Sequence, residues 1–208
     1  MVRRGIRPAL WVLVLAPIVW MIVRAGMGEL GANPIERLEG ETGRWTLRLL
    51  AGSLAVTPLI RITGWGWLIP QRRFLGLAAF FYAVMHLNVY IGLDHFFNVT
   101  DIVQDVLKHL YVTVGMTAFL LLVPLAVTST KGWIRRLGGK RWNRLHRLVY
   151  VAGTAGCIHF LWAVKKDKTE PILYIGVFIL LFALRFVGRR RTNGRSVGAL
   201  ASISAPEA

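Results

Sequence analysis

The chain is poor in cysteine and in acidic residues, and each shortage has a consequence. Cys157 is the only cysteine among 208 residues, so the chain can form neither an internal disulfide nor a cysteine-based metal site. Ten acidic residues stand against 26 lysines and arginines, which gives a formal net charge of +16. The sequence also lacks a G-x-G-x-x-G motif after a strand, a P-loop and a nucleophile elbow. The usual sequence signs of nicotinamide binding, nucleotide hydrolysis and acyl-group hydrolysis are therefore missing.

Long uncharged runs dominate what is present. Hydrophobic residues make up 55% of the chain and the mean hydropathy is +0.52, which is too apolar for a soluble domain of this length. We predict an all-α integral membrane protein, a bundle of six transmembrane helices. The predicted spans are Pro8–Val23, Trp45–Ile60, Phe74–Leu93, Leu110–Ser129, Leu148–Val164 and Ile172–Val187. They leave no room for a separate soluble domain, so we expect one membrane domain over residues 1–190 and a basic, disordered cytoplasmic tail over residues 191–208.

The charges alternate between the two sides of these spans. The N-terminal tail, the second and fourth loops and the C-terminal tail together carry 17 lysines and arginines, whereas the first, third and fifth loops carry 7. Nine of the ten acidic residues lie in the odd-numbered loops. The positive-inside rule therefore predicts that both termini are cytoplasmic and that the odd loops face outward. The basic balance is explained by the lipid bilayer, and we expect no nucleic-acid partner.

Histidines inside the apolar spans are the strongest indication of a functional site. A side chain that can ionise or bind a metal is costly within a bilayer, so it is a functional candidate by default. His86 lies thirteen residues after Arg73, where its span begins, and His159 lies thirteen residues after His146, where another begins. If both spans start at the same face, His86 and His159 lie at equal depth, roughly 20 Å into the membrane. Two neutral imidazoles at one depth can bind a heme iron from both sides, so we predict that they are its axial ligands.

Small residues precede both histidines on their helices. They are Gly76, Ala79 and Ala83 before His86, and Ala152, Gly153, Ala155 and Gly156 before His159. Small side chains would let a flat cofactor approach closely, but close packing of one helix on another explains the same pattern. Both interpretations are open at this stage.

His146 lies at the cytoplasmic edge and has three possible roles. It could ligate a second heme, form a hydrogen bond with a quinone or a flavin, or be a solvated interfacial residue. The neighbouring cations have an ordinary explanation in topology and anionic lipid, although some could pair with heme propionates or a flavin phosphate. These cations are Arg72, Arg73, Arg135, Arg136, Lys140, Arg141 and Arg144.

Two loops have patterns of their own. The third, between His95 and His109, can form a short amphipathic helix on the outer surface. Its apolar side would consist of Val99, Ile102, Val103, Val106 and Leu107. The fourth loop reads TKGWIRRLGGKRWNRLHR and mixes tryptophans and aliphatic residues with seven cations. The first and third outer loops are candidates for contact with a partner.

Several stretches of the sequence resemble a known family. The stretches PLIRITGW, RRFLGLAAFFYAVMHL, LAVTSTKGWIRRLGGKRWNRLHRLVY and IHFLWAVK, together with GANPIERLEGETGRWTLR, are similar to the heme-binding membrane subunits of bacterial periplasmic methionine-sulfoxide reductase systems, the MsrQ (or YedZ) family. The resemblance covers about residues 28–187. This family belongs to the ferric-reductase-like transmembrane group.

The resemblance implies a specific function. The protein would be a six-helix inner-membrane cytochrome b that carries electrons from the quinone pool, or from a cytosolic flavin reductase, to a periplasmic molybdopterin-dependent catalytic subunit (MsrP). That partner would repair methionine sulfoxide in envelope proteins, and this chain would be the electron-transfer subunit, with no complete substrate-reducing site of its own. The family implies heme b and FMN as cofactors, and its histidines correspond to His86, His146 and His159. Arg72 and Arg73 stand where larger ferric reductases have a fourth histidine, so we predict one heme and leave a second open.

Functions from other classes make different predictions. A histidine-based metal or proton transporter would use His86 and His159 as a relay, and it should carry acidic partners within the spans. A non-redox scaffold protein would bind no cofactor and would leave the equal depth of the two histidines unexplained. A stand-alone ferric or oxygen reductase would need a cytosolic flavin and nicotinamide domain, which this sequence lacks.

Overall fold

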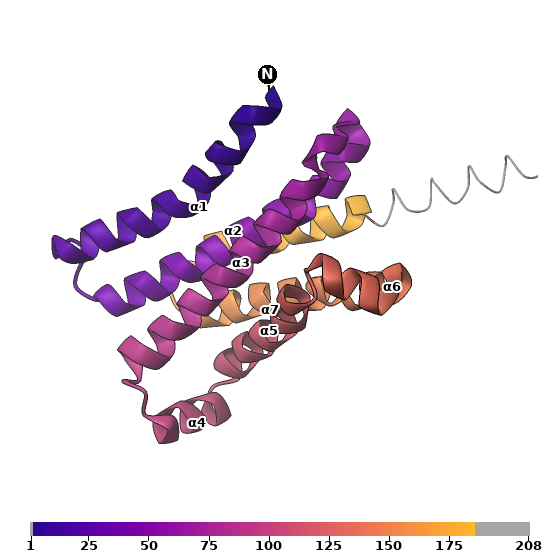
Figure 1. Ribbon diagram of the computed structural model, residues 1–208. Helices are drawn as coiled ribbons and strands as arrows, with labels where there is room; N and C mark the ends of the chain where they lie inside the picture. Colours follow the sequence, from indigo (N-terminus) through magenta and orange to yellow (C-terminus); the bar gives the residue numbers. More distant parts are fainter. Residues whose placement is uncertain (1, 186–208) are drawn as a thin grey trace, which may run out of the picture.

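The computed structural model describes residues 2–185, and these residues form a helical bundle without strands (Figure 1). The helices are α1 (Val2–Gly26), α2 (Pro34–Thr63), α3 (Ile69–Asn88), α4 (Val99–Lys108), α5 (Leu110–Val127), α6 (Lys131–Leu145) and α7 (Leu148–Ala163). A short 3-10 turn, η1 (Gly66–Leu68), precedes α3, and a π-helical segment, η2 (Val89–Asp94), extends it. Residues 169–185 are also helical. The predicted all-α class is confirmed.

Four of these helical stretches are long and apolar enough to cross a membrane. They are Ile6–Gly26, Pro34–Thr63, Gly66–Asp94 and Leu110–Val127, and α7 is a shorter apolar helix. Helices occupy the described part of all six predicted spans, but a count of six membrane crossings remains a prediction. The predicted end of the last span at Val187 and the predicted tail at residues 191–208 lie outside the described residues.

The second helix begins well before the predicted boundary, at Pro34 rather than Trp45. Asn33 caps it, since its side-chain oxygen accepts a hydrogen bond from the backbone N–H of Glu36 at 3.3 Å, and Pro34 occupies the first turn, where its missing N–H costs nothing. The helix ends at Gly64, whose φ of 74° suits glycine. The expected outer loop over residues 26–44 is therefore mostly helix.

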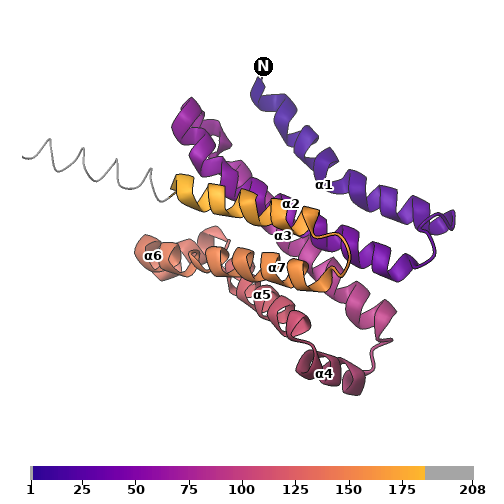
Figure 2. The same cartoon turned by 180° about the vertical axis from the view of Figure 1, so that it is seen from behind.

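The helices form two closely packed pairs. α2 packs along α3, and α5 packs along α7 (Figures 1 and 2). α4 and α6 lie at opposite ends of the bundle. We call the end with α4 and the connections at residues 27–33 and 164–168 the acidic end, and the end with η1 and α6 the basic end.

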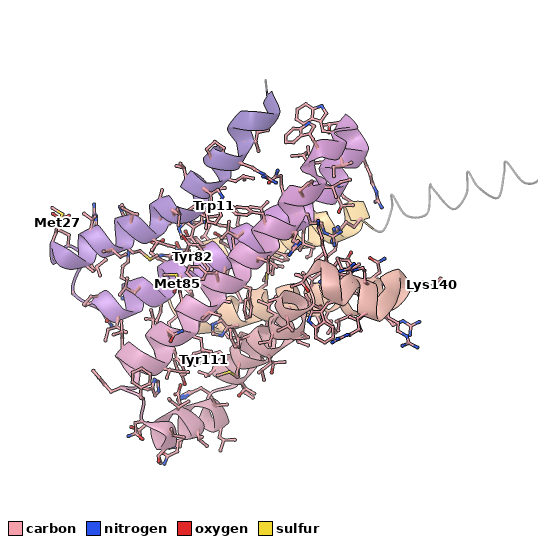
Figure 3. The ribbon with its side chains drawn as sticks, viewed as in Figure 1. Trp11, Met27, Tyr82, Met85, Tyr111 and Lys140 are labelled. Atoms are coloured by element: carbon pink, nitrogen blue, oxygen red, sulfur yellow. The ribbon has the colours of Figure 1, made fainter. Side chains whose placement is uncertain are left out.

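Tyr82 anchors the first helix to the bundle. Its ring is fully buried, and its hydroxyl donates a hydrogen bond to the carbonyl oxygen of Val14 at 2.6 Å. Figure 3 shows Tyr82 on α3 on the side that faces α1. Trp11 adds an edge-to-face contact with Phe74, with ring centres 5.0 Å apart. The rest of α1 exposes large apolar side chains, as a lipid-facing helix does.

Candidate cofactor site

His86 lies near the end of α3, against the first turns of α2. Its Nδ1 atom lies 3.1 Å from the carbonyl oxygen of Glu39 and 3.3 Å from the hydroxyl oxygen of Thr42. The Thr42 hydroxyl donates its own hydrogen to the Leu38 carbonyl oxygen at 2.7 Å, so it can only accept from His86. Nδ1 therefore carries the proton, and Nε2 of His86 keeps a free lone pair.

His159 is held in the same way from the other helix pair. Its Nδ1 atom lies 2.7 Å from the carbonyl oxygen of Tyr111, at the start of α5. A carbonyl oxygen can only accept, so Nδ1 donates the hydrogen and Nε2 is free to bind a metal. Histidines that ligate metals usually donate their other ring N–H to a carbonyl or a carboxylate, and both histidines meet this condition.

The two imidazoles lie next to each other in the bundle interior. Their ring centres are 6.0 Å apart and the ring planes are inclined by 74°. Metal–nitrogen bonds of about 2 Å on either side of one metal ion would place two imidazole centres roughly 6 Å apart. The predicted juxtaposition of His86 and His159 is present, and two neutral imidazoles are a donor set that would fit a heme iron.

A glycine on the facing helix makes room for each imidazole. Gly43 lies one turn after Glu39, and a Cβ atom there would be 3.4 Å from Cε1 of His86. Gly115 lies one turn after Tyr111, and a Cβ atom there would be only 2.6 Å from Nδ1 of His159. Each histidine thus reaches a backbone carbonyl across a glycine, an arrangement the sequence interpretation missed. Isolated glycines within apolar helices were the available signal.

The small residues that precede each histidine pack against other helices. A Cβ atom on Gly153 would approach Cε1 of Phe178 to 2.6 Å, and one on Gly156 would approach Cδ2 of Leu47 to 3.2 Å. A Cβ atom on Gly76 would lie 3.4 Å from the hydroxyl oxygen of Ser53. Of the two interpretations left open, close helix packing is therefore the one that the contacts support.

A separate cluster of polar side chains also lies at the acidic end. Asp105 of α4 accepts a hydrogen bond from the Tyr90 hydroxyl at 2.7 Å and lies 2.7 Å from Nδ1 of His109. His95 lies 3.4 Å from a carboxylate oxygen of Asp94. α4 is the predicted amphipathic helix, and Asn98 caps it. Several of its apolar side chains are exposed, namely Val99, Val103 and Leu107.

His146 lies at the basic end, between α6 and α7, and does not contact the histidine pair. Its ring stacks on Trp142 with centres 3.8 Å apart, and its Nδ1 lies 3.2 Å from the Trp142 carbonyl oxygen. Its Nε2 atom is buried without a hydrogen-bond partner among the described residues, and the Leu125 carbonyl is the other backbone acceptor near the ring. Burial lowers the pKa of His146 below its usual 6.5, so the ring is neutral at pH 7 and carries one N–H. A neutral ring can donate to only one of the two carbonyls, so when Nδ1 donates to the Trp142 carbonyl, Nε2 is left as a buried acceptor.

The fold and these residues define a class: a multi-pass helical membrane protein whose interior holds two facing histidines. Comparison with known sequences agrees. The family described as "Ferric reductase like transmembrane component" matches residues 42–157. Proteins named "Protein-methionine-sulfoxide reductase heme-binding subunit MsrQ" are similar over nearly the whole chain, and the chain belongs to this MsrQ family within the ferric-reductase-like transmembrane group.

The similarity extends over both chains in each comparison. The relative from Rhodospirillum rubrum is 51% identical over 192 residues, which is 91% of this chain and 92% of the relative. The relative from Herminiimonas arsenicoxydans is 46% identical over 86% of this chain and 84% of its own length. The relative from Caulobacter vibrioides is 46% identical over 89% of each chain.

Proposed function

We propose that the chain is a membrane cytochrome b, with His86 and His159 as the axial ligands of one heme b. The observation that carries the proposal is the matched environment of the two imidazoles: each Nδ1 donates to a backbone carbonyl, and the ring centres are 6.0 Å apart. The names of the relatives, which describe heme-binding subunits, support it. Heme iron held in this way supplies one-electron transfer within the membrane.

The surrounding residues have defined tasks in this proposal. The carbonyls of Glu39 and Tyr111 fix the tautomer and the orientation of the two rings, so each Nε2 would be available to hold the heme iron. Gly43 and Gly115 allow the rings to approach those carbonyls.

His146 is the candidate contact for the electron donor. Its Nε2 is a sheltered acceptor, so it suits a ligand that brings a hydrogen-bond donor, such as a quinol hydroxyl or a flavin N–H. We place quinone, or FMN supplied with electrons by a cytosolic flavin reductase, at this basic end. A second heme ligated by His146 is the competing assignment.

The proposed direction of transfer follows the charges. With the basic end in the cytoplasm, the histidine pair lies toward the outer face of the bacterial inner membrane, and both termini are cytoplasmic. The acceptor would be a periplasmic molybdopterin-dependent subunit (MsrP) that reduces methionine sulfoxide in envelope proteins. The relatives' names, as subunits of a methionine-sulfoxide reductase, support a catalytic partner of this kind.

The first experiment is a dithionite-reduced minus oxidised absorption spectrum of the purified full-length protein. We expect sharp b-type bands in the wild type, and their loss in both His86→Ala and His159→Ala. His95→Ala is the matched control, because His95 also lies at the acidic end but contacts Asp94 and Tyr90 instead.

Two results would contradict the proposal. A featureless wild-type spectrum from protein made with ample heme would favour the metal or proton transporter. Bands that survive in His159→Ala would show that the iron has a different ligand.

A further inference from the structure

A buried arginine that has no counter-charge among residues 2–185 lies at the basic end of the bundle. The side chain of Arg185 is only 7% exposed. Its guanidinium donates hydrogen bonds to the hydroxyl oxygens of Thr57 at 2.6 Å and Tyr150 at 3.3 Å, and it lies over the Tyr150 ring at 5.7 Å. Both partners are hydroxyls, so they satisfy hydrogen bonds but do not neutralise the charge.

Two further arginines increase the positive charge at this point. Arg72 of α3 and Arg61 of α2 lie close enough to Arg185 to repel it. The Arg61 side chain also donates a hydrogen bond to the Arg185 carbonyl oxygen at 3.2 Å, which ties that side chain to the backbone at residue 185. The cluster thus draws on three separate helices.

Carboxylates are all placed elsewhere in the described part of the chain. The ion pairs there join Arg24, Arg37, Arg44, His95 or His109 to acidic residues at the acidic end. Arg61, Arg72 and Arg185 have no carboxylate within 4 Å among residues 2–185. A buried charge is strongly unfavourable unless it is paired, so this arrangement calls for an anion from outside residues 2–185.

We propose that Arg185, Arg72 and Arg61 form an oxyanion site that binds a carboxylate or a phosphate at the basic end. Arginine suits this role because its planar guanidinium can donate two parallel hydrogen bonds to an oxyanion. The anion has two possible sources. One is the phosphate of an anionic lipid, and the other is a propionate of a second heme ligated by His146, because the proposed heme at His86 lies about 20 Å along α3 from Arg72. The propionate source rests on the cytochrome function and on that second heme, whereas the lipid source rests on neither.

The test compares Arg185→Met with the wild type in nanodiscs of phosphatidylcholine, with and without phosphatidylglycerol. Three quantities are measured: the heme-to-protein ratio, the number of phosphatidylglycerol molecules retained in native mass spectrometry, and the melting temperature. Arg135→Met is the matched control, because Arg135 is an exposed cation of α6 at the same end.

We expect Arg185→Met to weaken retention of one anion about tenfold or more, the usual effect of losing hydrogen bonds to a charged group. Loss of heme with lipid retention unchanged identifies a propionate, and the reverse identifies a lipid phosphate. The melting temperature should fall in either case, because a bound anion stabilises only the folded state. Arg185→Lys keeps the charge but not the planar pair of donors, so its loss should be smaller.

An unchanged or raised melting temperature in Arg185→Met, with heme and lipid both retained, would overturn the proposal. An unpaired buried charge replaced by an apolar side chain of similar length leaves a protein equally stable or more stable. An Arg185→Met protein that melts no lower than the wild type and retains both heme and lipid therefore has no oxyanion site. The same conclusion follows if Glu207→Gln reproduces the effects of Arg185→Met, since the chain's own carboxylate would then be the anion.

A substitute variant and the wild-type spectrum keep the test of the oxyanion site separate from the test of the heme proposal. If Arg185→Met does not fold, the exposed Arg61 is replaced instead, and Arg61→Gln should weaken the same anion. A wild type without heme bands would refute the proposed function and leave the lipid measurement readable. If the wild type shows heme bands and Arg185→Met changes neither anion retention nor the melting temperature, only the oxyanion site is refuted.

Discussion

The glycine beside His159 leaves less space for a side chain than the glycine beside His86 does. At Gly115 a Cβ atom would lie 2.6 Å from Nδ1 of His159, whereas at Gly43 the nearest His86 atom would be at an ordinary 3.4 Å. We expect Gly115→Ala to push His159 away from the Tyr111 carbonyl and to lower heme occupancy severalfold. Gly43→Ala should leave occupancy nearly unchanged. The reduced-minus-oxidised spectrum per mole of protein measures both, and equal occupancy in the two variants would contradict the packing argument.

The isolated position of His146 separates its role from that of the heme ligands. We expect His146→Ala to keep most of the heme but to slow its reduction by a soluble quinol at least about tenfold, the loss that one buried hydrogen bond of ~1.4 kcal/mol represents. Stopped-flow absorption of the heme band gives the rate, and dithionite reduction provides the control for total heme. Loss of all heme in His146→Ala would show that this assignment is wrong.

The contact of α7 with the helix at residues 169–185 depends on one glycine. A Cβ atom on Gly153 would lie 2.6 Å from Cε1 of Phe178, an aromatic side chain that is 2% exposed and has little freedom to move. Overpacking of this kind usually costs about 1–3 kcal/mol, so Gly153→Ala should lower the melting temperature in detergent. Gly176→Ala on the facing helix is the control, since nothing lies within 4 Å of its added Cβ atom. Equal melting temperatures would refute the contact.

The positions of the apolar helices followed from the sequence, but their ends did not, and α6 lies where the sequence predicted the fourth loop. Uncharged runs located every apolar helix because burial in lipid depends on composition alone. The start of α2 was misplaced, because a cap at Asn33 and a proline at Pro34 let the helix continue through polar residues. The pairing of His86 and His159 was predicted correctly, because each lies thirteen residues from the start of its predicted span. The glycines that admit their rings, Gly43 and Gly115, could not be identified because they lie on other helices, and one sequence does not show which helices are neighbours.

The whole molecule separates its charges, which makes its orientation testable. The exposed Asp101 of α4 lies at the acidic end, and Figure 3 shows Lys140 at the far tip of α6. We expect Asp101→Cys to react with a membrane-impermeant maleimide on intact spheroplasts, and Lys140→Cys to react only after lysis. Background labelling should be low because the native Cys157 is buried. The reverse pattern would place the basic end outside and contradict the proposed direction of transfer.

The distance between the two ends of the bundle has an electrical consequence. His146 and His159 are separated by thirteen residues, or about 20 Å along a helix, so an electron that passes between them crosses much of the low-dielectric layer. The membrane voltage acts on that movement, by about 2.3 kcal/mol per 100 mV for a complete crossing. With the basic end inside, an interior-negative voltage drives the electron toward the histidine pair. An imposed potassium diffusion potential, negative inside, in oriented proteoliposomes should therefore raise the steady-state level of reduced heme. The membrane voltage would then favour electron transfer through the bundle toward the outer face.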